Sequence, residues 1–130
     1  MDQAQILLYG LDDKRADRLR QLAQARGLWL REVRQATACL HLLQRGGLLV
    51  LRLGKDLERE LSLLERASHL FPHLATVVIG DDDNPLVNGL AWDLGARFVV
   101  LNATPADLLC DVVRAQLPAA DAAILKSDFS

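Results

Sequence analysis

The sequence predicts an α/β fold in which five parallel strands form one doubly wound sheet with helices on both faces. Short apolar runs alternate five times with segments whose apolar residues recur at helical spacing. Strict alternation of this kind requires right-handed crossovers, which place helices on both sides of a parallel sheet. The length of 130 residues suits a single domain, and no internal repeat or Gly/Ser-rich linker divides the chain.

The five apolar runs are expected to be the strands. They cover residues 5–10, 28–33, 48–54, 75–80 and 97–102. The runs "ILLY" and "LLVL" are continuously apolar, as expected for strands that are buried on both faces. The run "LWLREV" alternates weakly between apolar and polar residues, so it is predicted as a strand with weaker burial.

The segments between the strands are expected to be helices with recognisable ends. Asp12 or Asp13 can cap the first helix, whose apolar stripe stops at Gly27, a residue typical of helix C-termini. The second helix lies in "ATACLHLLQRGG" and ends at the Gly46-Gly47 pair. The fourth lies in "PLVNGLAWDLG".

The third and fifth helices are predicted in more detail. The third runs from about Asp56 to Leu70, with its Glu and Arg residues mainly outward. Its inward residues are expected to be Leu57, Leu61, Leu64 and Leu70. The fifth begins with Thr104 as N-cap and Pro105 as the first helical residue. We therefore expect a domain over residues 1–118, followed by a C-terminal extension or linker over residues 119–130.

Composition excludes several classes of function. A formal net charge of −2 argues against a dedicated nucleic-acid binder. No apolar run approaches the roughly 18 residues of a membrane span, and the N-terminus lacks the basic region of a signal peptide, so a cytoplasmic location is expected. Cys39 and Cys110 lie singly in apolar helical contexts and are interpreted as buried thiols of a reducing compartment.

Charge is unevenly distributed between the two halves of the chain. Residues 1–59 hold 11 Lys or Arg and 7 Asp or Glu, whereas residues 60–130 hold 4 and 10. One interpretation is that this asymmetry favours head-to-tail contacts or an oriented partner. The other is that these residues form the ordinary solvated surface of a soluble protein.

Three consecutive aspartates, Asp81 to Asp83, follow the fourth strand in "VVIGDDDNPL". Three carboxylates at a strand end suggest a divalent-cation site. The alternative is that they begin a helix, with Asp83 or Asn84 as N-cap, Pro85 at the first helical position and the carboxylates at the positive end of the helix dipole. We favour the helix start and expect no metal site here.

The segment "GLAWDLGARFVVLNATPADLLCDVVRAQL" resembles part of the response-regulator receiver (CheY-like) domains. It is similar to their fourth helix, the turn at Gly95 and Ala96, their fifth strand and their last helix. The resemblance covers residues 4–117, although only this last third is distinctive. It implies the flavodoxin-like strand order 2-1-3-4-5.

Receiver chemistry requires specific groups at the strand ends. An acidic pair after the first strand and an aspartate ending the third hold Mg²⁺, and that aspartate takes the phosphoryl group. A hydroxyl after the fourth strand and a lysine after the fifth then bind the phosphoryl oxygens.

The corresponding positions in this sequence carry none of these groups. They are Gly10 and Leu11 after the first strand, Arg52 at the end of the third, Gly80 after the fourth and Asn102 after the fifth. The resemblance therefore implies a degenerate pseudo-receiver that is not phosphorylated and has no catalytic residue, metal or cofactor. We hypothesise that Arg52 supplies a positive charge near Asp12 or Asp13; alternatively, it is a solvent-exposed arginine.

In receivers the fourth helix, fifth strand and fifth helix form a face that contacts partners. The corresponding candidate contact residues are Val87, Trp92, Arg97 and Val99. A partly exposed tryptophan there would anchor an interface. The alternative is that Trp92 covers the edge of the core.

Two functions follow. The first is a phosphorylation-independent pseudo-receiver that regulates by contact with a protein partner or a second copy, in a signalling or transcription-regulatory protein with an effector domain beyond residue 118. The second is a sensor of a small anionic ligand or nucleotide, bound in a crevice lined by Gly10, Arg52, Gly80 and Asn102. No Walker A, Gly-x-Gly-x-x-Gly or Gly-x-Ser-x-Gly pattern indicates an enzyme, and neither membrane contact nor direct nucleic-acid binding is expected.

Overall fold

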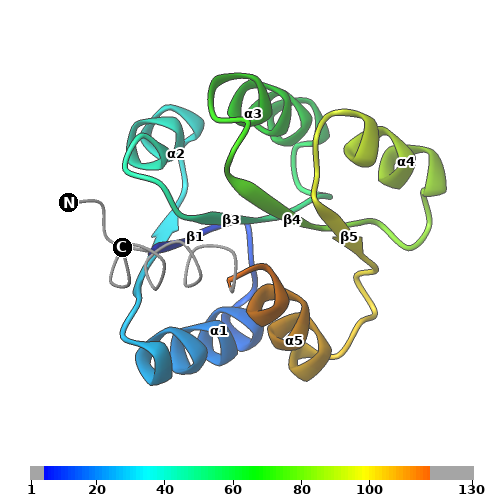
Figure 1. Cartoon of the computed structure of the whole chain (residues 1–130). Coiled ribbons are helices and arrows are strands. Elements are labelled where there is room, and N and C mark those ends of the chain that lie inside the picture. The colour runs from blue at the N-terminus through cyan, green and yellow to red at the C-terminus, as the bar shows by residue number, and fades with distance from the viewer. Residues whose placement is uncertain (1–4, 118–130) are drawn as a thin grey trace.

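Five parallel strands form the centre of the protein in a computed structural model that describes residues 5–117. The strands are β1 (Gln5–Tyr9), β2 (Trp29–Val33), β3 (Leu48–Arg52), β4 (Ala75–Ile79) and β5 (Phe98–Val100). They lie in the order β2-β1-β3-β4-β5, and each neighbouring pair is parallel (Figure 1). The predicted fold class and strand order are confirmed.

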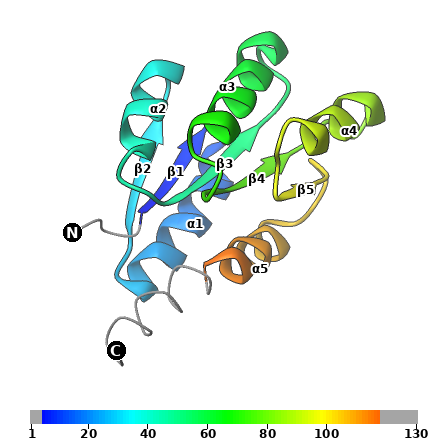
Figure 2. The ribbon, with the colours of Figure 1, turned by 45° about the horizontal axis from the view of Figure 1, so that its top comes forward.

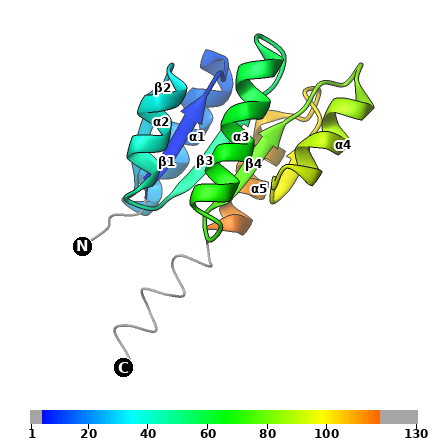
Figure 3. The same ribbon diagram turned by 90° about the horizontal axis from the view of Figure 1, so that it is seen from above.

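Helices cover both faces of this sheet. They are α1 (Asp13–Arg26), α2 (Ala36–Leu43), α3 (Leu57–Leu70), α4 (Pro85–Asp93) and α5 (Ala106–Gln116). Figure 1 shows α2, α3 and α4 on one face and α1 and α5 on the other, and the turned views of Figures 2 and 3 agree. Both sheet faces are therefore removed from water, which explains the continuous apolar runs of the central strands.

Successive residues of the central strands belong to different halves of the core. In β1, Ile6 and Leu8 pack with the layer of α1 and α5, whereas Leu7 packs with the layer of α2, α3 and α4. In β3, Val50 packs with the layer of α1 and α5, whereas Leu51 packs with the layer of α2, α3 and α4. The edge strand β2 has exposed positions in most of its length, in keeping with its weakly alternating sequence.

The starts of α1 and α4 confirm the predicted caps. Asp12 precedes α1, and its side chain accepts a hydrogen bond from the N–H of Arg15 at 3.4 Å. Gly27 ends this helix with φ 68°, a left-handed conformation that favours glycine. Asn84 caps α4 through the N–H of Val87 at 3.3 Å, and Pro85 is the first helical residue.

Two predictions about helices are wrong in detail. Helix α5 begins at Ala106 and its N-cap position is Pro105, so Thr104 is not the cap. Thr104 instead closes a turn, in which its N–H donates to the carbonyl oxygen of Leu101 at 3.0 Å. Leu70, predicted to point inward, is 58% exposed. It lies six residues after Leu64, which is roughly 240° around a helix and therefore on another side.

The predicted extension over residues 119–130 lies outside the described residues, so the expected domain boundary stays a prediction. Within residues 5–117, none of the helices combines the length and the apolar character needed to cross a bilayer.

Glu60 is an exception to the outward orientation predicted for the acidic residues of α3. It is 2% exposed. Its carboxylate accepts hydrogen bonds from three consecutive backbone N–H groups, those of Gly54, Lys55 and Asp56, at 2.8, 3.3 and 3.1 Å. Asp56 is the N-cap of α3 and accepts from the N–H of Arg59 at 3.4 Å. Two carboxylates therefore organise the connection between β3 and α3.

Replacing Glu60 with alanine should destabilise the protein strongly. The change leaves three backbone donors without their acceptor, so we expect the free energy of unfolding to fall by about 2–3 kcal/mol. Urea denaturation measures this quantity. The exposed Glu58→Ala on the same helix is the control, and its effect should stay within about 0.5 kcal/mol. Equal effects of the two variants would contradict the assignment.

Candidate functional site at the carboxyl end of the sheet

Parallel strand direction brings the predicted site positions to one edge of the sheet. Gly10 and Leu11 follow β1, Arg52 ends β3, Gly80 follows β4, and Asn102 comes shortly after β5. A β-carbon at Gly10 would lie 3.3 Å from the carbonyl oxygen of Arg52. The N–H of Gly80 donates to the carbonyl oxygen of Val100 at 2.7 Å. Among these positions the only polar side chains are one guanidinium and one amide.

The side chain of Asn88, from α4, fills the space beside Gly80. A β-carbon added at Gly80 would lie 2.2 Å from the Oδ1 atom of Asn88. That oxygen accepts a hydrogen bond from the N–H of Asp81 at 2.9 Å, and Nδ2 of Asn88 donates to the carbonyl oxygen of Asp81 at 2.9 Å. Gly80 is therefore next to an amide side chain that ties α4 to the end of β4.

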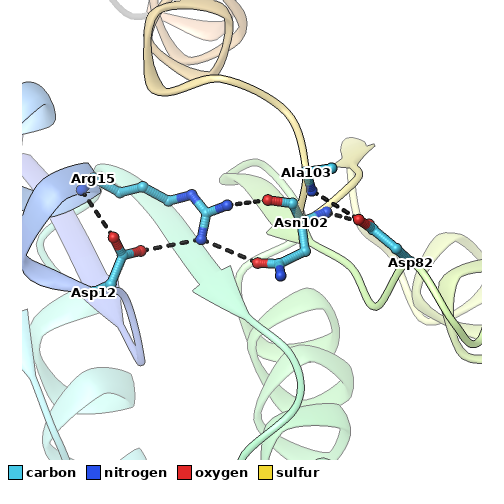
Figure 4. Close-up of polar contacts among 5 residues, drawn as sticks. All are labelled: Asp12, Arg15, Asp82, Asn102 and Ala103. Atoms are coloured by element: carbon cyan, nitrogen blue, oxygen red, sulfur yellow. Dashed lines mark hydrogen bonds and ion pairs between the residues drawn. The ribbon is translucent and has the colours of Figure 1, made fainter.

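Arg15 connects the start of α1 with the end of β5 (Figure 4). Its Nη1 atom donates to Oδ1 of Asp12 at 3.0 Å and to Oδ1 of Asn102 at 3.1 Å, and Nη2 donates to the carbonyl oxygen of Asn102. The Arg15 side chain is 13% exposed, so water competes little for these contacts. One guanidinium therefore joins two loops that are 87 residues apart in the chain.

Asp82 holds the loop after β5 from the other side (Figure 4). Its carboxylate accepts hydrogen bonds from the N–H groups of Asn102 at 2.6 Å and Ala103 at 2.9 Å. We refer to Asp12, Arg15, Asp82 and Asn102 together as the Arg15 network. The network links the loops that follow β1, β4 and β5, so it restrains three connections at once.

Asp12 is held in its charged form within this network. Burial by itself raises its pKa, but the hydrogen bond from the N–H of Arg15, that of its own N–H and the nearby guanidinium together bring the pKa below the usual 3.8. Asp12 is therefore ionised at neutral pH, and its ion pair with Arg15 is present under those conditions.

The hypothesis that Arg52 provides the cation beside Asp12 or Asp13 is wrong, because Arg15 pairs with Asp12. Within residues 5–117, no hydrogen bond or ion pair joins Arg52 to either aspartate. The three-residue spacing of Asp12 and Arg15 was the one sequence signal that could have predicted their ion pair. Ordinary surface pairs on helices have the same spacing. The contact of Arg15 with Asn102 depends on the tertiary fold.

A cavity of about 660 Å³ opens at the carboxyl ends of β1 and β2. Gly10 and Leu11 are among its lining residues, but the other predicted crevice residues, Arg52, Gly80 and Asn102, are not. Its charged lining consists of Asp12, Asp13, Glu32, Asp56 and Glu60 with Arg34, Lys55 and Arg59. Since carboxylates outnumber cations there, the cavity does not favour an anionic ligand.

The three aspartates after β4 do not form a metal cluster. Asp82 binds the loop after β5, Asp81 accepts from the N–H of Asp83 at 3.0 Å, and Asn84 provides the helix cap. Within the described residues, no group of three His, Cys, Asp or Glu is placed to hold a metal ion. The predicted helix start is confirmed, whereas the contact of Asp82 with Asn102 was not predicted.

Both cysteines are buried, as predicted. Burial raises the pKa of Cys39 to about 11 and also raises the pKa of Cys110. Both thiols are therefore protonated at neutral pH, which makes them poor nucleophiles and poor metal ligands.

The predicted contact residues differ in their exposure. Trp92 is 48% exposed, and its ring centroid lies 5.9 Å from that of Phe98. Arg97 is exposed as well. Val87 and Val99 are half-buried and pack against the core beneath α3 and α4. The two aromatic rings are therefore more suited than the valines to contact another molecule.

Removing the Arg15 side chain should loosen the end of β5. Arg15→Ala leaves Asn102 without two charge-assisted contacts, so we expect the free energy of unfolding to fall by about 2 kcal/mol. Hydrogen exchange at Asn102 and Ala103 should accelerate. The control is Arg20→Ala, because Arg20 pairs with Asp17 and Glu32 at an exposed position, which is worth less than about 1 kcal/mol. Unchanged exchange at Asn102 in the Arg15 variant would contradict the network.

Neither a family model nor a curated protein matches this sequence. Solved structures do match it. NtrX from Brucella abortus is 22% identical, with a TM-score of 0.73, over 98% of this chain and 30% of that one. This chain thus spans less than a third of NtrX. Its receiver domain alone matches over 87% of this chain and 98% of that one, at a TM-score of 0.70.

A second receiver similarity comes from another organism. The signal receiver domain of an HD domain-containing protein from Pseudomonas fluorescens is 20% identical, with a TM-score of 0.75, over 94% of this chain and 92% of that one. At these identities the comparison concerns the fold. Strand order, helix placement and structural similarity together establish that this chain has the flavodoxin-like fold of response-regulator receiver domains.

Proposed function

We propose that this chain is a pseudo-receiver, a regulatory domain of a signalling or transcription-regulatory protein that works by protein contact and not by phosphorylation. The Arg15 network carries this proposal. In a receiver, a lysine after the fifth strand contacts a phosphoryl group held by the third strand. Here Asn102 stands at the lysine position and is already bound by Arg15 and Asp82.

The end of β3 supports the absence of phosphorylation. Arg52 is its last residue, and Leu53, which follows, is 3% exposed. Neither side chain can form an acyl phosphate. Gly10 and Leu11 after β1 also lack the oxygen ligands that Mg²⁺ requires. The site therefore lacks both the acceptor of the phosphoryl group and the ligands of its metal.

Exposed apolar side chains support a contact surface on α4, β5 and α5. Within the described residues, eight large apolar side chains are exposed, and six belong to these elements or the loop after β5. The six are Leu86, Leu90, Trp92, Phe98, Leu101 and Leu108. Concentration of apolar surface on one side of a protein is typical of an interaction site. The contact surface is therefore proposed to include these six residues with Arg97.

The cavity beside β1 and β2 gives less support to a ligand sensor. An anionic ligand or nucleotide needs an excess of cations or free backbone N–H groups. The carboxylates of the lining outnumber its cations, and Glu60 already occupies the N–H groups of residues 54–56. Protein contact is therefore the function that we propose.

Phosphorylation can be tested with acetyl phosphate and Mg²⁺. We expect no increase in mass for the wild-type chain, because the position that ends β3 has no carboxylate. Arg52→Asp restores one carboxylate but not the metal ligands after β1, so it should also stay unmodified. Intact-protein mass spectrometry gives the answer, with a receiver that carries the usual aspartate as positive control. A phosphoryl increment on the wild-type chain would overturn the proposal.

The contact surface can be tested by making it polar. Leu86 and Leu90 are 85% and 42% exposed, so Leu86→Gln with Leu90→Gln should leave the fold intact. We expect this variant to self-associate at least about tenfold more weakly than the wild type, measured by sedimentation equilibrium. Leu70→Gln, which changes a 58% exposed leucine on α3, is the matched control. Identical association of all three proteins would refute the assigned surface.

A further inference from the structure

Residues 28–47, at the β2 edge of the molecule, carry an excess of positive charge, with three arginines and one glutamate. Arg31, Arg34 and Arg45 are exposed on β2 and in the loops beside α2. Glu32 is the only acidic residue among residues 28–47, and it is already paired with Arg20 at 2.8 Å. Trp29, which is 52% exposed, lies 5.8 Å from the guanidinium carbon of Arg31. We refer to Trp29, Arg31, Arg34 and Arg45 as the basic end.

The opposite edge carries uncompensated negative charge. Asp81, Asp82 and Asp83 precede α4, and Asp93 is its last residue. Arg97 is the only cation among residues 80–103. The acids of α5 do not add to this imbalance, because Asp107 pairs with Arg18 and Asp111 pairs with Arg114. We refer to Asp81, Asp82, Asp83 and Asp93 as the acidic end. It borders the exposed apolar residues of α4 and β5 described above.

The two ends lie at opposite edges of one sheet, since β2 and β5 are its outermost strands (Figure 1). Each end has at least one charged residue near the carboxyl ends of the strands and another near their amino ends. Arg34 follows the carboxyl end of β2, as Asp83 follows that of β4. Arg45 follows the C-terminus of α2, whereas Asp93 is the last residue of α4, and both helices run back toward the amino ends of the strands. Two copies with parallel strands would thus bring Arg34 near Asp83 and Arg45 near Asp93.

We propose that copies of this chain associate head to tail, with the basic end of one copy against the acidic end of the next. This inference rests on the proposed function. The molecule that binds the contact surface is a second copy of this chain, through its β2 edge. Charge complementarity favours this occupant over a symmetric pairing of two α4–β5–α5 faces, because a symmetric pairing would bring the two acidic ends together. Such a contact leaves one free end on each copy, so it propagates into open chains unless a rotation closes a ring.

Sedimentation velocity on the full chain tests the contact. We expect oligomers at low salt and mostly monomer at about 0.5 M salt, where charges are screened beyond roughly 4–5 Å. Arg34→Glu with Arg45→Glu, and separately Asp83→Lys with Asp93→Lys, should each weaken association at least about tenfold. All four residues are outside the Arg15 network, and circular dichroism of each variant checks that it is folded.

The four substitutions combined provide the decisive variant. This charge-swapped protein has complementary ends again, so its self-association should return toward the wild-type level. It should not join wild-type oligomers, because every mixed contact then pairs like charges. Mixing a fluorescently labelled swapped protein with unlabelled wild type measures this directly.

Other outcomes would overturn the head-to-tail contact in distinguishable ways. If only the aspartate variant alters association, the interface is symmetric; the contact surface of the proposed function survives and the head-to-tail contact fails. A wild-type chain that is monomeric at low salt also refutes the head-to-tail contact, whereas phosphorylation independence is decided separately by the acetyl phosphate assay. Failure of the swapped protein to associate, with both double variants folded, would refute the pairing of these ends.

Discussion

The common direction of the strands is the constraint on which the rest of the structure depends. Because all five strands run in parallel, the loops after β1, β3, β4 and β5 meet at one edge of the sheet. The same constraint requires helices on both faces, so the central strands are mostly apolar, and few of their side chains are polar. At the carboxyl ends of the strands, the polar contacts of the Arg15 network therefore come from the loops and from the first turn of α1.

The Arg15 network holds this edge together through side chains of the chain itself. A guanidinium from α1 and a carboxylate from the loop after β4 bind the same short segment, residues 102–103. The side chain and backbone of Asn102 are both used, which limits the freedom of the connection into α5. In the proposed function this restraint keeps the domain in one state, so that regulation depends on what binds its surface.

Charge differs between the two outer edges of the sheet, along the direction that runs across the strands. The cations around β2 and the aspartates around α4 are at the two outer edges of the sheet, where a long-range attraction between copies is least cancelled within each copy. In the proposed head-to-tail contact, the apolar residues beside α4 and β5 supply the surface that becomes buried once charge has oriented two molecules. In that proposed contact, charge sets the orientation of the two copies, while buried apolar area provides most of the affinity.

Local patterns alone predicted the fold class, the order of the elements and most helix ends. Gly27 and the pair Asn84 and Pro85 act through conformations and hydrogen bonds within one turn, so the sequence determines them directly. Thr104 failed as a cap because the backbone forms a turn before the helix begins.

Tertiary structure decided the partners of the polar residues. Glu60 is a charged residue of a kind that usually lies on the outer side of a helix. It is buried here because the loop after β3 turns three backbone N–H groups toward its carboxylate. Arg15 and Asp82 are distant from Asn102 in the chain and meet it only when the sheet has aligned its strand ends. The sequence by itself determined where strands and helices form, because those signals are local. Which charges pair, and which stay free at the two edges, was decided by the fold, because those contacts join residues that are far apart in the chain.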